Sequence, residues 1–208
     1  MRANQFLLPL AVLLSVSAPL ISPAASPAGS GWIERHKLTA SDATAREVFG
    51  HSVAISGDTA IVGAPTALDP FGIVDAGGSA YLFDVTTGNE VYKLTASDAE
   101  SDDYFGSSVA ISGNIAIVGA YADDDGGTDS GSAYLFDVAT GDELYKLTAS
   151  DARSGDRFGL SVAISGDKAI VGTSASGTDG AAYLFDVATG NELDKLTASD
   201  AESGAYFG

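Results

Sequence analysis

The hydrophobic and polar positions along this chain form short runs that recur in a fixed order. Ser52–Ser56 alternates apolar and polar residues, as a strand with one covered face does. A glycine-first turn at Gly57-Asp58 suits a tight hairpin, and a continuous apolar run begins at Ala60. Further runs at 80–85 and 90–96 complete the unit, and none of them has helical spacing. The pattern predicts four β-strands in each unit.

This unit is repeated along the chain. The dipeptide Phe-Gly marks each copy, at Phe49, Phe105, Phe158 and Phe207, with spacings of 56, 53 and 49 residues. A four-stranded unit of this length matches one blade of a β-propeller, whereas a sandwich has no need of the same four strands three times. We therefore expect an all-β chain, a β-propeller of four-stranded antiparallel blades, with a β-solenoid as the alternative. The expected blades are about 49–104, 105–157 and 158–206.

The two ends of the repeat array predict a larger ring. Residues 32–48 resemble only a fourth, outer strand and its loop, and Phe207-Gly208 begins a fourth copy. Propellers typically have four to eight blades. The pattern thus predicts three blades plus the start of a fourth, as part of a larger propeller spanning 29–208 and beyond.

Residues 1–28 have the order of a secretory signal peptide. Arg2 is the only charge, an apolar stretch follows at 6–21, and small residues allow cleavage after Ala24 or Ala28. The alternative, a membrane anchor, needs about 20 apolar residues, and Pro9 and Pro19 interrupt this shorter stretch. We expect a secreted protein, at an extracellular, cell-surface or periplasmic location, with no transmembrane segment after cleavage.

The charge of the chain restricts its partners. The full sequence has 10 basic and 28 acidic residues, a net charge of −18, and removing Arg2 brings it to −19. Nucleic acid is an unsuitable partner, because its affinity comes from neutralising phosphates with Lys and Arg. The acidic surface suits a cation-rich medium or a basic partner. Cysteine is absent, so packing has to stabilise the fold.

Variation between the copies is confined to one face of the predicted propeller. Tight turns, which hardly vary, join the first strand to the second and the third to the fourth. The links between blades are eight residues long, as in 97–104 and 150–157, and the second-to-third loops are 14, 11 and 7 residues long at 65–78, 121–131 and 174–180. Variable loops on a constant scaffold are where binding sites usually lie. The candidate ligand-binding residues are Phe71, Asp102, Asp103, Tyr104, Tyr121, Asp124 and Asp156.

Residues that recur in every copy are expected to serve packing or turns. For Asp84, Asp137 and Asp186, we expect the carboxylate to bind the backbone of the turn that follows.

The repeats resemble the FG-GAP repeat, best known from the seven-bladed head of integrin α chains. The residues that carry the resemblance are Phe49-Gly50 with Ile61–Pro65, Phe105-Gly106 with Ile117–Ala120, and Phe158-Gly159 with Ile170–Gly172, where Thr173 replaces the usual alanine. The resemblance implies a propeller, used in adhesion, in glycan binding or beside an enzyme. The calcium loop of integrin repeats is not carried over, because a short Ser-Gly-Asp or Ser-Gly-Asn turn stands in its place.

The sequence offers one candidate metal site and no recognisable catalytic set. Asp123, Asp125 and Asp129 match the later part of a calcium loop, but the first ligand position would be Tyr121, and a solvated acidic loop is the alternative. Calcium is therefore a candidate ligand, and no cofactor is assigned. The two histidines, His36 and His51, stand at variable positions, and we predict that the chain is not an enzyme.

These observations favour a non-catalytic binding or adhesion module for a protein or glycan ligand. Two alternatives stay open: an accessory propeller of a larger secreted enzyme whose catalytic domain lies outside this chain, and a structural role in a surface layer.

Overall fold

The computed structural model describes residues 33–43, 48–65, 77–174, 180–200 and 208. The chain divides into a unit 1–34, of which only Ile33 and Glu34 are described, and a unit 35–208 that holds every strand of the described residues. The signal-peptide prediction for 1–28 and the predicted site residue Phe71 lie outside the described residues. No helix within the described ranges is long and apolar enough to cross a bilayer.

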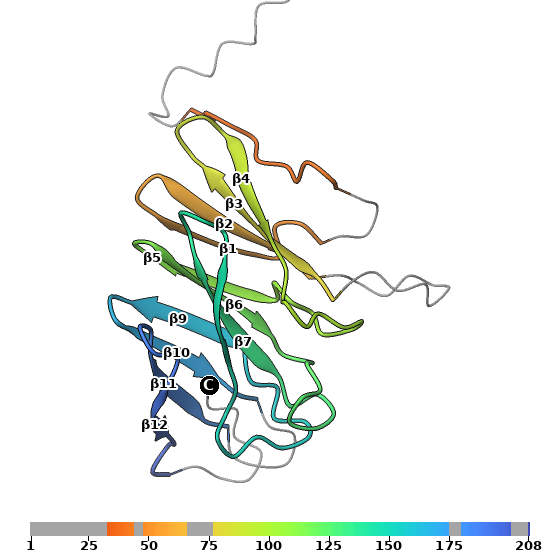
Figure 1. Ribbon diagram of the computed structural model, residues 1–208, viewed down its shortest axis with the longest axis vertical. Coiled ribbons are helices and arrows are strands. Elements are labelled where there is room, and N and C mark those ends of the chain that lie inside the picture. The colour runs from red at the N-terminus through yellow and green to blue at the C-terminus, as the bar shows by residue number, and fades with distance from the viewer. Residues whose placement is uncertain (1–32, 44–47, 66–76, 175–179, 201–207) are drawn as a thin grey trace, which may run out of the picture. The chain divides into compact units, whose positions relative to one another are not determined.

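The described part of the chain is all-β and forms three four-stranded antiparallel sheets, each in chain order (Figure 1). Blade 1 contains β1 (Ser52–Ser56), β2 (Thr59–Ala64), β3 (Ser79–Asp84) and β4 (Asn89–Leu94). Blade 2 contains β5 (Ser108–Ser112), β6 (Ile115–Ala120), β7 (Ser132–Asp137) and β8 (Glu143–Leu147). Blade 3 contains β9 (Ser161–Ser165), β10 (Lys168–Gly172), β11 (Ala182–Asp186) and β12 (Glu192–Leu196). The predicted fold class is confirmed.

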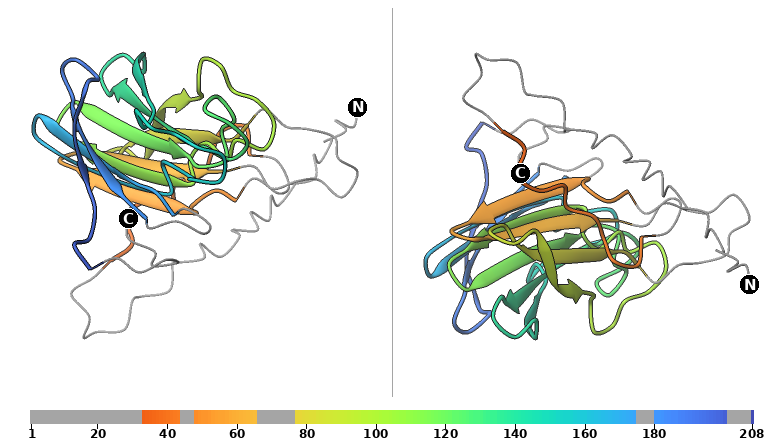
Figure 2. Two further views of the ribbon diagram at one scale, coloured as in Figure 1. Left: turned by 90° about the horizontal axis from the view of Figure 1, so that it is seen from below. Right: turned by 90° about the horizontal axis from the view of Figure 1, so that it is seen from above.

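The blades pack face to face. The first strand of blade 2, β5, contacts both β1 and β9, so the first strands of the blades are neighbours (Figure 2). One apolar cluster lies between blades 1 and 2, and a second lies between blades 2 and 3. Both faces of blade 2 are therefore covered, which explains why its second and third strands are apolar on both sides.

The Phe-Gly pair ties each blade to the blade before it. Phe105 is fully buried and packs edge-on against Tyr134 and Phe136 of its own blade, at 5.5 and 5.8 Å between ring centroids. Gly106 has a φ of +92°. It lies so close to Gly63 that a Cβ added to Gly63 would be 2.0 Å from the Gly106 carbonyl oxygen. Close approach of two backbones thus requires these glycines.

The recurrent aspartates bind the turns that follow them, as predicted. Asp84 Oδ1 accepts hydrogen bonds from the backbone N–H groups of Thr86 and Thr87. Asp137 and Asp186 make equivalent bonds to their own turns.

The outward face of β1 is open. Val53 and Ile55 are 68% and 66% exposed, whereas Val109 and Ile111, their counterparts on β5, are 9% and 8% exposed because they pack against blade 1. Two adjacent apolar side chains therefore face solvent on blade 1.

Candidate functional site

A Ser-Asp pair at the start of a link forms hydrogen bonds with the blade that follows it. Ser97 binds Glu143 through its backbone N–H and its hydroxyl, at 2.9 and 3.0 Å. Its neighbour Asp98 accepts hydrogen bonds from Tyr134, at 2.9 Å, and from Lys146, at 2.6 Å. Equivalent contacts join Ser41 and Asp42 to Glu90, Tyr81 and Lys93, and Ser150 and Asp151 to Glu192, Tyr183 and Lys195. The Ser-Asp pair recurs because it holds neighbouring blades together.

The segment before blade 1 is held in the same way. His36 Nε2 lies 3.1 Å from the Thr86 carbonyl oxygen, and its ring lies over Gly88. Tyr92 and Tyr145 make the matching contacts in the next two copies, through hydrogen bonds to the carbonyl groups of Ala139 and Ala188. His36 therefore has a packing role in the segment before β1, although the described residues 33–40 of the predicted outer strand form no strand, and the other histidine, His51, is exposed.

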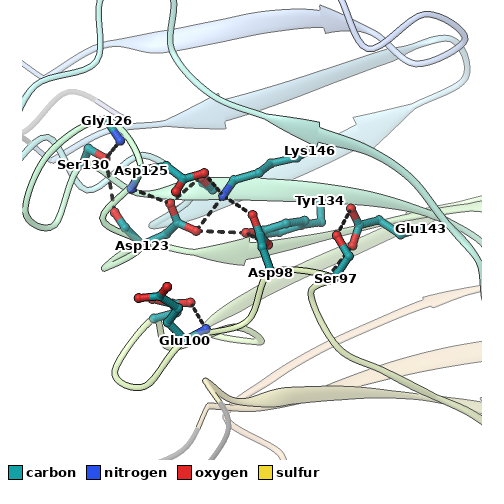
Figure 3. Close-up of polar contacts among 12 residues, drawn as sticks. Ser97, Asp98, Glu100, Asp123, Asp125, Gly126, Ser130, Tyr134, Glu143 and Lys146 are labelled. Atoms are coloured by element: carbon teal, nitrogen blue, oxygen red, sulfur yellow. Dashed lines mark hydrogen bonds and ion pairs between the residues drawn. The ribbon is translucent and has the colours of Figure 1, made fainter.

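In blade 2, two further carboxylates join the contact between the link aspartate and the lysine (Figure 3). Lys146 Nζ lies 2.6 Å from Asp98 Oδ2, 2.9 Å from Asp123 Oδ2 and 2.5 Å from Asp125 Oδ2. It also lies 5.4 Å from the centroid of the Tyr134 ring, within range of a cation–π contact. Burial alone would lower the pKa of Lys146, but the hydrogen bonds to the three aspartates raise it above its ordinary value, so the ammonium stays charged.

Asp123 fixes the second-to-third loop of this blade. Only 3% of the residue is exposed. Its Oδ1 accepts hydrogen bonds from the Asp125 N–H and the Ser132 hydroxyl, and its Oδ2 accepts from the Tyr134 hydroxyl and Lys146. Burial and the adjacent Asp123 charge raise the pKa of Tyr134, which keeps that hydroxyl protonated as a donor.

The predicted metal residues are only partly brought together. Carboxylate oxygens of Asp98, Asp123 and Asp125 lie within 4.8 Å of one another, close enough to surround an ion. Asp129 is not in this group, and its backbone N–H donates to Asp124 Oδ1 at 2.8 Å.

A second buried carboxyl lies below the same loop. Asp103 is 5% exposed, and one carboxylate oxygen accepts a hydrogen bond of 2.7 Å from the Glu100 N–H. Burial raises the pKa of Asp103 to about 6, and the negative charges of Asp123 and Glu100 add to the effect, while the Glu100 hydrogen bond and Lys146 oppose it. The Asp103 side chain therefore lies in the interior formed by the loops and not on their outer surface.

Three variable loops meet around blade 2. The Ala122 N–H donates to the Asp103 carbonyl oxygen at 3.3 Å, which joins loop 121–131 to link 97–104. On the other side, the Gly155 and Arg157 N–H groups donate to the carbonyl groups of Thr128 and Asp129, at 2.8 and 3.0 Å. We call the three segments 97–104, 121–131 and 150–157 the loop surface.

The loop surface carries an aromatic pair and strained backbone. Tyr104 and Tyr121 stack with ring centroids 5.2 Å apart and planes 13° from parallel, and both are half-buried. The described non-glycine residues with positive φ are Asp102, Tyr104, Asp129 and Arg157, and all four lie on this surface. Strain of this kind persists only where the surroundings fix it, and it is common at binding sites.

Most of the remaining predicted site residues also lie on the loop surface. Asp102 and Asp124 are exposed, and Asp156 is half-buried with its carboxylate bound to the Arg153 N–H. Sequence reasoning missed Asp98 and Lys146 as members of a cluster because both recur in every blade.

The match to a family profile agrees with this architecture. The sequence profile of the FG-GAP repeat matches residues 32–83, 89–136 and 142–185, more than half of the chain. No curated protein matches the sequence. Among solved structures, a europium-containing methanol dehydrogenase is similar, with 18% identity and a TM-score of 0.47 over 69% of this chain and 24% of that chain. The chain thus spans about a quarter of that protein.

Proposed function

Because this chain belongs to the FG-GAP repeat family, we propose that it is a non-catalytic binding or adhesion module that acts outside the cytoplasm. Its ligand would be a protein or a glycan, held by the loop surface. The proposed location rests on the secretory pattern of residues 1–28.

One observation carries the proposal. Three loops of the variable face, 97–104, 121–131 and 150–157, are joined by backbone hydrogen bonds into one surface, and that surface holds the Tyr104–Tyr121 stack. The opposite face has only the tight turns, which hardly vary between copies. Selection for a partner acts on side chains that can touch it, so the variable surface is the better candidate for recognition.

The chemistry of the surface suits a partner with both apolar and basic groups. The stacked tyrosines offer rigid aromatic area, and tyrosine is enriched where proteins bind one another. Exposed Asp102 and Asp124 lie on the same three loops, and the whole chain carries a net charge of −18. Attraction to a basic partner would raise the association rate and weaken as salt screens it.

The test uses residues 29–208, the chain expected after signal cleavage and called the mature chain, labelled and applied to peptide and glycan arrays at low and high salt. Tyr104→Ala with Tyr121→Ala is expected to weaken binding to the selected ligand at least tenfold, since buried aromatic anchors commonly contribute more than about 1.4 kcal/mol.

Asp58→Asn and Asp142→Asn are matched controls on the tight turns, because Asn already occupies these positions in other repeats, at Asn114 and Asn89. They remove negative charge from the opposite face and should leave the affinity for the selected ligand unchanged. Equal loss in the controls, or full binding by the double tyrosine variant, would contradict the proposal.

A further inference from the structure

The acidic cluster of blade 2 already contains a cation, and that cation belongs to the chain. The Lys146 ammonium lies 2.5 to 2.9 Å from one carboxylate oxygen each of Asp98, Asp123 and Asp125. We infer that Lys146 occupies the position that a divalent ion would take among these carboxylates, and that it orders loop 121–131 without metal.

Comparison of the three blades shows that the lysine is placed by the scaffold. Lys93 and Lys195 lie over Tyr81 and Tyr183 at 5.6 and 5.1 Å, and each contacts one link aspartate, at 2.6 and 2.7 Å. Lys146 has the same relation to its own tyrosine and link aspartate. Among the described residues, its additional contacts are Asp123 and Asp125, and both come from loop 121–131. The loop therefore folds onto an ammonium that the repeat has already positioned.

The charges explain why the loop needs this ammonium. Asp123 is almost completely buried, and a buried carboxylate without a positive partner is costly. Lys146 supplies that partner and also contacts the exposed Asp125. A calcium ion at the same place would meet a like charge at contact distance, and this repulsion opposes its binding. The carboxylates can accept a metal only when the lysine is removed.

This inference does not depend on the proposed ligand-binding role, and metal binding alone tests it. Terbium serves as the probe for the calcium position, because a nearby tyrosine sensitises its emission and Tyr134 donates to both Asp98 and Asp123. The mature wild-type chain should give no terbium emission, and calcium should leave its melting temperature unchanged. Lys146→Met should bind calcium at least about tenfold more tightly than wild type, and its melting temperature should rise with calcium concentration.

Lys195→Met is the matched control. It removes the same side chain from blade 3, where Asp151 is the one carboxylate of the described residues that contacts the lysine, so it should gain no calcium binding. Lys146→Arg keeps the positive charge and should behave as wild type.

Three results would overturn the inference: wild-type terbium emission that Asp125→Asn abolishes, calcium binding by Lys195→Met as tight as by Lys146→Met, or a folded Lys146→Met that binds no calcium. If Lys146→Met does not fold, the terbium emission of wild type and of Lys146→Arg tests the inference. Terbium emission from either protein contradicts the inference. The absence of emission from both proteins in the folded state supports it.

Discussion

The Ser108 hydroxyl donates a hydrogen bond of 2.7 Å to the carbonyl oxygen of Gly159, the glycine of the next blade's Phe-Gly pair. The same carbonyl oxygen would lie 2.0 Å from a Cβ added at Gly119. The first and second strands of blade 2 thus contact one peptide group of blade 3. Ser52 makes the same bond to Gly106, which shows that this contact joins successive blades.

Gly119→Ala is therefore expected to destabilise the protein by about 1–3 kcal/mol, the usual cost of overpacking a well-packed interior. Chemical unfolding measures the change. Gly57→Asn is the control, because nothing lies within 4 Å of an added Cβ there, although φ is +58°. Asparagine tolerates that conformation, so this variant should lose less than about 1 kcal/mol. Equal losses would show that close approach is not the reason for glycine at 119.

Tyr134→Phe should cost more stability than Tyr183→Phe. Tyr134 donates to buried Asp123 as well as to Asp98, so its loss leaves a buried carboxylate without one of its donors, at about 1–3 kcal/mol. Tyr183 donates to the half-exposed Asp151, which water can solvate instead, so about 0.5–1.5 kcal/mol is expected. Urea unfolding of the two variants under one set of conditions gives the comparison, and an equal or reversed order would contradict the assigned role of Asp123.

Asp103 should make stability fall as pH rises. Its folded pKa of about 6 is above its ordinary value of 3.8, so the folded state holds the proton more tightly than the unfolded state does. This contribution is fully present below pH 4 and is lost as pH rises to about 6. The pKa difference limits the loss to about 3 kcal/mol.

Asp103→Asn keeps the acceptor for the Glu100 N–H and removes the ionisation. Thermal unfolding should find this variant similar to wild type near pH 4 and more stable above pH 6. A variant that is less stable than wild type at pH 7.5 would show that the Asp103 charge is not the source of the penalty.

The open face of blade 1 should promote self-association of the mature chain. Val53 and Ile55 expose adjacent apolar area that their counterparts bury against another blade. Sedimentation velocity should find association that increases with concentration, and Val53→Asp with Ile55→Asp should reduce it. Val91→Asp changes another exposed valine, 48% exposed on β4, and should have less effect. A wild-type chain that stays monomeric at all concentrations would refute this expectation.

The sequence was sufficient to predict the fold because the repeat displays each structural requirement several times. The Phe-Gly pair, the turn glycines and Asp84 recur with the same local partners, and the predicted strands and turn contacts are confirmed. The sequence predicts Asp123 and Asp125, together with Asp129, as candidate calcium ligands. The sequence does not predict Lys146, the common partner of Asp123 and Asp125, because this residue is distant in sequence and is followed by the same residues as the other repeat lysines.

The stacking of Tyr104 on Tyr121 was also beyond reach of sequence reasoning. Both residues were predicted to lie on the variable face, but their contact depends on the positive φ of Tyr104 and on how link 97–104 meets loop 121–131. Such conformations follow from packing between loops, which no local pattern records.

Hydrogen exchange of the mature chain with and without the ligand selected on the arrays tests the central claim most directly. The account predicts slower exchange on binding in segments 97–104, 121–131 and 150–157, with no change at the tight turns 57–58, 113–114 and 166–167. Protection confined to the tight turns, with the loop surface unchanged, would contradict the assignment of the binding face.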